Sequence, residues 1–385
     1  MAVSPPVQLD RQRIKELTER EERVLNEKTA GSGEMYKRAQ KFLSGGVASS
    51  YQLRDPWPIY LERGSGPLVW DVDGNEYFDF HNGFGSMVQG HANPAIGRAI
   101  SERYALGTHF AAPTEDAIVV GEELAERWKL PQWRYTNSGS ESTMDAIRIA
   151  RAYTKRDTIL KIFGSYHGHH DGVMVSIGVE YDKIGDRFNL ESLPYGAGIP
   201  QAVVDLTIAV PFNDAEAMEH RIKALGGGMP TGAIGGTEEV MSVVEDGSVF
   251  QVGTYNGNPL GMAAARANLQ EVLTPDAYEH LAHLNGRILG GCEGVIERHN
   301  LPGYAVGVGS KGCVTFSPEK IVDYETFKAN QDADVAELAW LFNMNRGIFM
   351  TPGREEEWTL SVTHTDEAVD RYVEVFAELA EAISA

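Results

Sequence analysis

A lysine followed by a glycine-rich run has the clearest chemical potential in this sequence. Lys223 stands just before glycines 226–228 and 232. Glycines let the backbone pack closely beside a lysine, and a desolvated lysine near other cations has a lowered pKa and forms imines readily. No Gly-Lys-Ser/Thr sequence closes the run, so it is not a P-loop. Lys223 is therefore a candidate for a covalent bond to a carbonyl compound, although a single lysine is more often a solvated surface charge.

Three small polar residues occupy a predicted strand-to-helix turn. Ser138, Gly139 and Ser140 follow the short strand that ends near Tyr135. At such a turn, unused backbone amides and the helix dipole converge with side-chain hydroxyls, which suits a phosphate group. An ordinary capped helix start has the same composition, so the segment alone does not establish a binding site.

An aromatic and histidine-rich segment follows the predicted strand 158–163, at the sheet edge where ligands of open α/β folds bind. Tyr166 could stack there on a flat ring, with His167 beside it. A metal site built from His167, His169, His170 and Asp171 is the competing interpretation. Three histidines within four residues reach one ion only with unusual backbone geometry, so the metal site is the less favoured of the two.

A fourth segment, residues 253–259, contains Thr254 among turn residues and leads into a predicted helix of small side chains at 261–267. Taken alone, it indicates only a loop that enters a buried helix.

The surrounding pattern predicts the elements that must position these residues. Helical patterns at 94–106, 116–128 and 143–153, followed by the strand 158–163, predict a parallel sheet with helices on both faces. Asp73 and Gly74 separate two β-like runs, 68–70 and 77–80, which indicates a hairpin.

The two ends of the chain have helical patterns. Residues 367–383 have an apolar stripe, and Thr365 can cap this helix. Residues 9–28 place few apolar side chains among many charges, so we expect an exposed helix or arm that needs another surface, which a dimer partner could supply.

Size and charge limit the class of protein. A chain of 385 residues exceeds the size of one hydrophobic core, so two or three lobes are expected. The net charge of -21 argues against binding to nucleic acid or to an anionic membrane. Cys292 and Cys313 have no metal-type spacing and are expected to be reduced thiols. The N-terminal residues lack the apolar stretch of a signal peptide, so a cytoplasmic location is expected.

The four segments, in this order, resemble the class III aminotransferases of the fold-type I pyridoxal 5'-phosphate (PLP) enzymes. The branch they resemble contains glutamate-1-semialdehyde aminomutase and β-amino-acid aminotransferases. Residues 68–80 with Gly90-His91-Ala92-Asn93-Pro94 look like the family's N-terminal signature, and residues 361–365 look like its C-terminal one.

The resemblance implies a fold. It is α/β, with a large domain built on a mostly parallel central sheet and a small α+β domain formed by both termini. On this chain, residues 1–85 would be the N-terminal arm and part of the small domain. Residues 86–275 would be the large PLP-binding domain, and residues 276–385 the rest of the small domain.

The resemblance also implies a cofactor and its ligands. PLP would form a Schiff base with Lys223, and Tyr166 would stack on its ring beside His167. Its phosphate would bind Ser138, Gly139 and Ser140, together with Thr254 of the neighbouring subunit, which implies a homodimer.

The implied reaction is transfer of an amino group between an amino acid or amine and a keto acid. A glutamate-1-semialdehyde 2,1-aminomutase is the alternative, and a catalytically degenerate PLP-fold binding protein is an alternative of another class. Aminomutases have an arginine soon after Gly-Gly-Val, whereas here Gly45-Gly46-Val47 is followed by Arg54 seven residues later. Arg54 and Arg354 are candidates for binding a substrate carboxylate, and a surface ion pair is as good an interpretation of each.

The sequence departs from the family just before Lys223. Family members carry an Asp-Glu-Val type strand whose aspartate pairs with the pyridine nitrogen, and no Asp-Glu-Val or Asp-Glu-Ile occurs in this chain. Residues 213–222 lead directly into Lys223. The missing strand–helix unit would take roughly 30 residues or more. We therefore expect that a segment is absent between Ile222 and Lys223, and its loss would open the middle of the parallel sheet.

Overall fold

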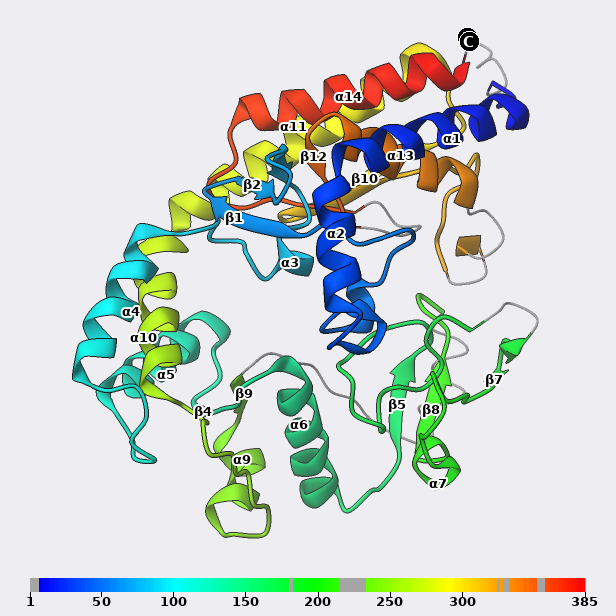
Figure 1. Ribbon diagram of the computed structural model, residues 1–385. Coiled ribbons are helices and arrows are strands. Elements are labelled where there is room, and N and C mark those ends of the chain that lie inside the picture. Colours follow the sequence, from blue (N-terminus) through cyan, green and yellow to red (C-terminus); the bar gives the residue numbers. More distant parts are fainter. Residues whose placement is uncertain are drawn as a thin grey trace. The chain divides into compact units, whose positions relative to one another are not determined.

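The chain forms two units in the computed structural model, which describes residues 7–179, 183–214, 233–323, 326–327, 332–351 and 357–384 (Figure 1). Unit 1 contains Met1–Ala95, Glu271–Lys320 and Asn330–Ala385, and unit 2 contains Ile96–Gln270 and Ile321–Ala329. Both termini thus contribute to unit 1. Two of the candidate site residues, Lys223 and Arg354, lie outside the described residues.

Unit 1 contains two small sheets. The first has the strand order β1-β2-β3-β12, formed by β1 (Leu61–Ser65), β2 (Leu68–Asp71), β3 (Glu76–Asp79) and β12 (Ile348–Phe349). The second has the order β10-β11-β13, formed by β10 (Tyr304–Val308), β11 (Lys311–Thr315) and β13 (Glu357–Thr359).

The predicted hairpin is confirmed. Strands β2 and β3 pair antiparallel, with Val69 opposite Tyr77. Gly74 has a φ of +85°, which a glycine adopts at little steric cost. The carboxylate of Asp73 also accepts hydrogen bonds from the backbone amides of Gly31 and Ser32, so the turn is attached to the N-terminal segment.

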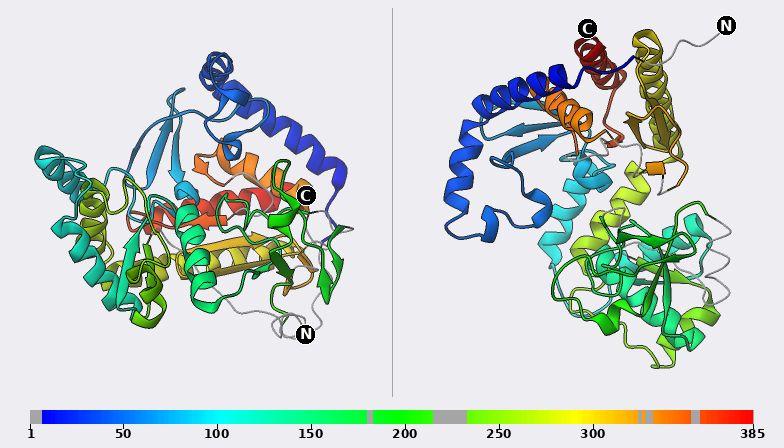
Figure 2. Two further views of the ribbon diagram at one scale, coloured as in Figure 1. Left: turned by 90° about the horizontal axis from the view of Figure 1, so that it is seen from below. Right: turned by 90° about the vertical axis from the view of Figure 1, so that its right-hand side faces the viewer.

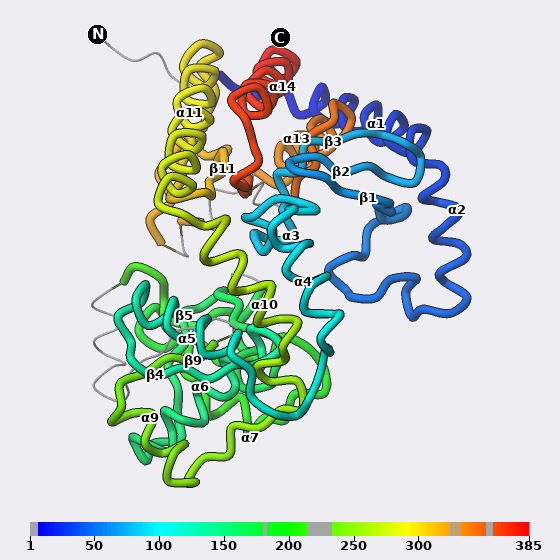
Figure 3. The backbone as a smooth tube through the Cα atoms, turned by 90° about the vertical axis from the view of Figure 1, so that its left-hand side faces the viewer, coloured from blue at the N-terminus to red at the C-terminus, as the bar shows by residue number. Residues whose placement is uncertain are grey.

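Long helices pack on these sheets around one large hydrophobic core. They are α1 (Arg11–Lys28), α11 (Pro275–His299), α13 (Ala333–Asn345) and α14 (Asp366–Ser384), and the shorter α2 (Ala30–Ala39) follows α1. Helix α14 lies against α11 (Figure 3) and begins as predicted, because the Thr365 hydroxyl accepts a hydrogen bond from the Ala368 amide at 3.3 Å. Short turns complete the unit at η1 (Ser44–Gly46), η2 (Ser50–Gln52) and α3 (Asn82–Gly85).

Residues 9–28 were expected to need a covering surface that a dimer partner could supply, and the chain itself supplies one. Helix α1 packs along α13 of the same chain (Figure 2) and buries Ile14, Leu17 and Leu25 there. The sequence pattern did not identify this stripe, because it consists of only three apolar residues among many charged ones. The covering surface is therefore intramolecular.

The two terminal family signatures contact each other inside unit 1. A Cβ atom on Gly90 would lie 2.3 Å from the Thr363 hydroxyl, and the Val362 amide donates to the Val88 carbonyl at 2.8 Å. Gly90 is therefore required where the two segments cross. Next to this crossing, His91 contacts the buried Asp79 carboxylate at 2.6 Å.

The two cysteines do not form a disulfide, and the sequence predicted reduced thiols. Cys292 is buried in α11, where desolvation raises its pKa, and Cys313 is half-buried in β11. Within the described ranges, no helix is long and apolar enough to cross a membrane.

Unit 2 alternates helices and strands. Its helices are α4 (Pro94–Leu106), α5 (Glu115–Trp128), α6 (Gly139–Thr154), α7 (Gln201–Val204), α9 (Glu238–Glu245) and α10 (Pro259–Ala267), followed by the π-helical turn η4 (Asn268–Val272). Its strands are β4 (Gln132–Tyr135), β5 (Ile159–Ile162), β6 (Gly185–Asp186), β7 (Asn189–Leu190), β8 (Thr207–Val210) and β9 (Ala233–Gly236). The helices predicted at 94–106 and 116–128 and the strand predicted at 158–163 are confirmed within one or two residues.

The strands of unit 2 pair two by two. Strand β5 is parallel to β8, β4 is antiparallel to β9, and β6 pairs with β7. Figure 1 draws β4 with β9 and β5 with β8 as separate pairs. The parallel crossover predicted from the sequence is thus present between β5 and β8, whereas the described residues do not join the pairs into one central sheet.

Candidate active site

The segment predicted to bind an anion, here called the anion seat, lies at the N-terminus of α6. Ser138 is extended and caps the helix, because its hydroxyl oxygen accepts a hydrogen bond from the Glu141 amide at 3.2 Å. The amides of Gly139 and Ser140 donate to no other group within the described part of the chain. A Cβ atom on Gly139 would meet nothing within 4 Å, so the backbone is uncovered on that side of the helix start. Free first-turn amides at the positive end of a helix dipole can bind a phosphate.

The segment that contains Tyr166 is held against this helix start. The hydroxyl of Thr143 in α6 donates to the His167 carbonyl at 2.7 Å, and the His169 amide donates to the Ser140 hydroxyl oxygen at 3.1 Å. Gly168 has a φ of +100°, and a Cβ atom there would lie 2.7 Å from the Ser140 Cα. Only a glycine allows this approach, which places the aromatic loop directly beside the anion seat.

Tyr166 and His167 have different exposure. Tyr166 is 46% exposed. His167 is half-buried, and its Nε2 lies 3.0 Å from the Ser165 hydroxyl. Burial, and secondly the positive charge of Lys161, lower the pKa of His167. The imidazole is therefore neutral near pH 7 and can lie beside a flat ring without adding a charge.

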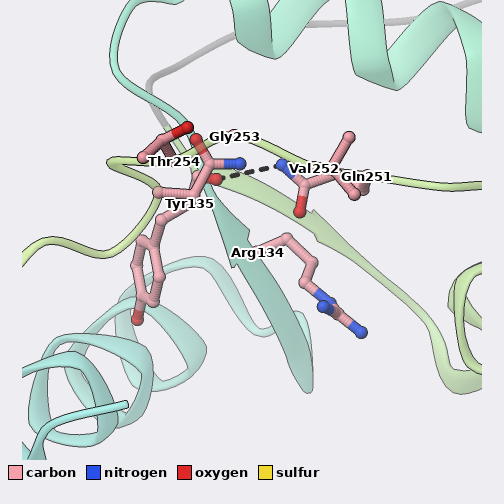
Figure 4. Close-up of a pocket in the computed structure, with 7 residues that line it drawn as sticks. Arg134, Tyr135, Gln251, Val252, Gly253 and Thr254 are labelled. Atoms are coloured by element: carbon pink, nitrogen blue, oxygen red, sulfur yellow. Dashed lines mark hydrogen bonds between the residues drawn. The ribbon is translucent and has the colours of Figure 1, made fainter. Parts of the chain in front are cut away.

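Thr254 lines a cavity in unit 2. The cavity has a volume of about 560 Å³, and its lining includes Arg134, Tyr135, Gln251 and Thr254. Figure 4 shows the side chains of Arg134 and Tyr135 diverging, as neighbouring residues of a strand do, while the Gln251 amide reaches the Tyr135 carbonyl at 3.0 Å.

Two side-chain contacts attach the Thr254 loop to the anion seat. The amide of Asn137, next to Ser138, donates to Asn256 at 3.1 Å. Gln251 also donates to the buried carboxylate of Asp145 in α6 at 3.2 Å. The structure therefore brings the three chemistry-bearing segments around Ser138, Tyr166 and Thr254 together in unit 2.

Sequence reasoning missed two residues of this site. Thr143 connects α6 to the Tyr166 loop, and Gln251 connects α6 to the Thr254 loop. Thr143 follows Ser140 by three residues, which places both on one face of the helix, and that spacing is the signal that could have found it. Gln251 gave no comparable signal, since its role depends on the path of a loop.

Arg54, a candidate for a substrate carboxylate, already has partners in unit 1. Its guanidinium carbon lies 3.4 Å from the centre of a Trp340 ring, and one of its nitrogens lies 3.7 Å from the Glu337 carboxylate. Burial lowers the pKa of Arg54 to about 10. These contacts favour a packing role for its cation.

The histidines considered as metal ligands contact other groups. His170 lies 3.3 Å from the Thr143 hydroxyl, and burial lowers its pKa. In the ranges that the structure describes, no three histidine, cysteine or acidic side chains come together as a metal site.

Fold and site together define a class of protein. A helix-start anion seat, an aromatic loop after a parallel strand and a small domain built from both termini are the features of fold-type I PLP-dependent transferases. The family model described as aminotransferase class-III matches residues 50–222 and 218–337. The chain belongs to this family, and its cofactor is PLP.

Relatives with two kinds of activity resemble this chain. A curated glutamate-1-semialdehyde 2,1-aminomutase 2 from Brevibacillus brevis is 30% identical over 89% of this chain and 96% of its own length. The solved structure of an omega-transaminase from Sphaerobacter thermophilus is 30% identical, covers 92% of this chain and 98% of its own, and has a TM-score of 0.84. A structure described as a transaminase with PLP bound is 26% identical, covers 92% and 98% of the two chains, and has a TM-score of 0.79.

The described residues fit part of the cofactor. The unused amides of Gly139 and Ser140 suit its phosphate, and the exposed ring of Tyr166 suits one face of its pyridine ring. The residue that would hold it covalently, Lys223, lies outside the described residues. Fold, family and cofactor are therefore established, while the specific reaction requires a proposal.

Proposed function

We propose that this protein is an aminotransferase that moves an amino group between an amino acid or amine and a keto acid. The observation that carries the proposal is the anion seat at the start of α6. Its first-turn amides have no other acceptor among the described residues, and Thr143 attaches the Tyr166 loop to the same helix. The omega-transaminase relative supports the reaction class, since it covers nearly the whole chain at 30% identity.

Each residue has a role in this proposal. Ser138, Gly139 and Ser140 bind the phosphate through amides and hydroxyls, and Tyr166 covers the ring next to the neutral His167. Lys223 would hold the cofactor covalently, and its amine would carry a proton to or from the substrate carbon. PLP supplies the electron sink that makes this proton transfer feasible.

Thr254 supports a homodimer. Its hydroxyl is exposed beside a cavity, and its loop is anchored to the anion seat of its own chain through Asn137 and Asn256. In the proposed dimer, Thr254 reaches the phosphate held by the other subunit. We also propose a cytoplasmic location for the protein, because its composition is that of a globular enzyme.

The aminomutase alternative has its own supporting observation, because curated relatives at 30% identity have that name. Against it stands Arg54, which is displaced from the aminomutase position and packs on Trp340. With Arg54 engaged in this way, Arg354 is the remaining candidate for a substrate carboxylate. An aminotransferase is therefore our first proposal and an aminomutase the second.

Spectroscopy and substrate exchange test the proposal. The purified protein is loaded with PLP, and the visible absorption of the lysine-bound cofactor is recorded before and after addition of amine donors. An aminotransferase loses the band with donor and regains it with a keto acid. An aminomutase instead converts glutamate-1-semialdehyde with no second substrate, because it moves the amino group within one molecule.

Two variants control this experiment. Lys223→Ala should abolish the visible band, whereas Lys41→Ala, at an exposed lysine of unit 1, should leave it unchanged. A band that persists in Lys223→Ala would show that another lysine holds the cofactor. A stable band with no donor or acceptor turnover would identify the third possibility, a PLP-fold binding protein without catalysis.

A further inference from the structure

A second cavity in unit 2, which we call the α6 cavity, has a volume of about 210 Å³. Its lining comes from α6, from the loop after β5 and from α7. Three of the lining side chains, Arg148, Arg151 and His170, can carry a positive charge, and none of the described lining residues is acidic. In a chain with a net charge of -21, such a local group of cations points to an anionic ligand.

Helical spacing places two guanidinium groups on the same side of α6. Arg148 and Arg151 are three residues apart, so they are neighbours on the helix surface, where like charges destabilise each other. Arg148 donates to the Asp145 carboxylate, and the Nε of Arg151 donates to the Asp157 carbonyl at 2.6 Å. The terminal nitrogens of Arg151 have no acceptor among the described residues. They are therefore available to a carboxylate, whose geometry a guanidinium group matches.

His170 contributes a ring nitrogen from the loop after β5. Its Nε2 lies 3.3 Å from the Thr143 hydroxyl, and that hydroxyl gives its own proton to the His167 carbonyl. Nε2 is therefore the donor in this contact. The other ring nitrogen, Nδ1, lies toward Gly172, which also lines the cavity, at 3.5 Å from the position of a Cβ atom there.

The charges of the two arginines reach the His170 ring. Burial lowers the pKa of His170, Asp171 acts in the opposite direction, and Arg148 and Arg151 lower the pKa further. The three cationic side chains are therefore close enough to act on one ligand. A bound anion would favour the charged ring, which could then donate from Nδ1.

The rest of the lining is mainly apolar. Met144 and Ile147 of α6 and Val203 of α7 contribute hydrocarbon or thioether side chains. Pockets with apolar walls and a few polar groups bind small organic molecules, and the polar groups fix their orientation. This composition favours a carboxylate with a short apolar chain over inorganic phosphate, which would leave the apolar walls without a partner.

The α6 cavity is separate from the anion seat. Arg148 and Arg151 follow Ser140 by eight and eleven residues, which is roughly 12 and 16 Å along the helix axis. Neither the residues of the anion seat nor Tyr166 contribute to its described lining. A ligand in this cavity would therefore leave the phosphate position open.

We propose that the α6 cavity is a second binding site, and that it takes a small organic carboxylate with a short apolar chain. The guanidinium groups of Arg148 and Arg151 bind the carboxylate oxygens, and His170 completes the polar end. The apolar chain lies against Met144, Ile147 and Val203. This site does not depend on the choice between aminotransferase and aminomutase.

Methyl NMR of the full chain tests the proposal, because Met144 lies in the cavity wall. The protein is labelled with carbon-13 at its methionine methyl groups, the Met144 signal is assigned with Met144→Leu, and isovalerate is added. We expect a saturable shift of this signal with a dissociation constant of about 1 mM or lower. Isopentylamine, which has the same carbon chain and a positive charge, should cause no shift. Inorganic phosphate should bind at least roughly tenfold more weakly.

Arginine variants test the polar end of the site. Arg151→Gln and Arg148→Gln should each weaken isovalerate binding roughly tenfold or more, because each removes a charged hydrogen-bond donor. Arg156→Gln, at an exposed arginine beyond the end of α6, should leave the affinity unchanged. The remaining methionine signals show whether each variant is folded.

Three results would overturn the proposal. They are an unshifted Met144 signal with isovalerate, unchanged affinity in both arginine variants, and equal binding of phosphate or of the amine. The titration is repeated with excess PLP, where we expect the same affinity. A shift that PLP abolishes would place the carboxylate at the anion seat and would also contradict the proposal. Because the Met144 signal is read with and without PLP, failure of the proposed function would leave this test unaffected.

Discussion

The two units of this chain differ in how completely their strands are joined. In unit 1, each sheet is continuous, and side chains from four long helices and both sheets enclose one large core. Among the described residues of unit 2, the strands pair two by two, and the buried apolar side chains form two small clusters around Ile149 and Phe163. Unit 1 takes its elements from segments before residue 96 and after residue 270, whereas unit 2 contains the middle of the chain.

The contrast shows that the anion seat keeps its local structure even though the described strands beside it are joined only in pairs. The anion seat depends on one strand, one turn and the first turn of α6, all of which are close in sequence. The cover of β5 depends on strands that arrive from elsewhere in the chain. Local hydrogen bonds therefore hold Ser138 in its capping position, while three of the four side chains of β5 are only half-buried.

Hydrogen exchange of the 385-residue chain should show the largest difference between the units. The amide of Phe78 in β3 and the amide of Ile159 at the start of β5 both have 2.8 Å hydrogen bonds, to Gly347 and Leu206. We expect exchange at Ile159 to be roughly 100-fold faster or more, because a two-stranded pair opens locally. Mass spectrometry of the exchanged peptides measures this, and equal rates would refute the contrast.

A core substitution should destabilise unit 1 alone. Trp358 is fully buried, and its indole donates to Asn285 at 2.9 Å. Trp358→Ala should lower the free energy of unfolding of unit 1 by about 3–5 kcal/mol. The control Trp128→Ala, at an exposed residue of α5, should change it little. Urea unfolding followed by circular dichroism tests this, and a simultaneous shift of both units would show that they unfold together.

Acid should destabilise unit 1 through His364. Burial lowers the pKa of this histidine to about 4, so the folded state favours the neutral ring. Its contribution is present above pH 6.5 and is lost as the pH falls toward 4, about 3 kcal/mol in total. His364→Gln should flatten the pH dependence of unfolding in this window, whereas the exposed His283→Gln should not. An unchanged profile in His364→Gln would contradict the prediction.

A smaller effect is expected in unit 2 at Thr143. Thr143→Val removes the hydroxyl that donates to the His167 carbonyl, which should cost about 1–3 kcal/mol and loosen the Tyr166 loop. PLP titration should show weaker binding, while Thr154→Val, an exposed threonine of the same helix, binds normally. Normal PLP affinity in Thr143→Val would mean that the loop is positioned by other contacts.

Much of the fold could be predicted from the sequence because its signals are local. The Asp73-Gly74 hairpin, the helices at 94–106 and 116–128 and the Thr365 cap depend on neighbours a few residues away. The seat at Ser138 followed from the same kind of pattern. The partner of α1 could not be predicted, because the stripe of Ile14, Leu17 and Leu25 does not say which surface will cover it.

The sequence by itself determined the order of the chemistry-bearing segments, the family resemblance and the place where the chain departs from it. Only the tertiary structure decided that Thr143 and Gln251 connect those segments, that Arg54 packs on Trp340, and that Lys161 is buried. The physical reason is that burial and pairing are properties of surfaces brought together from distant parts of the chain. A local pattern specifies which side chains lie on one face of a helix or strand. The tertiary fold determines which other element packs against that face.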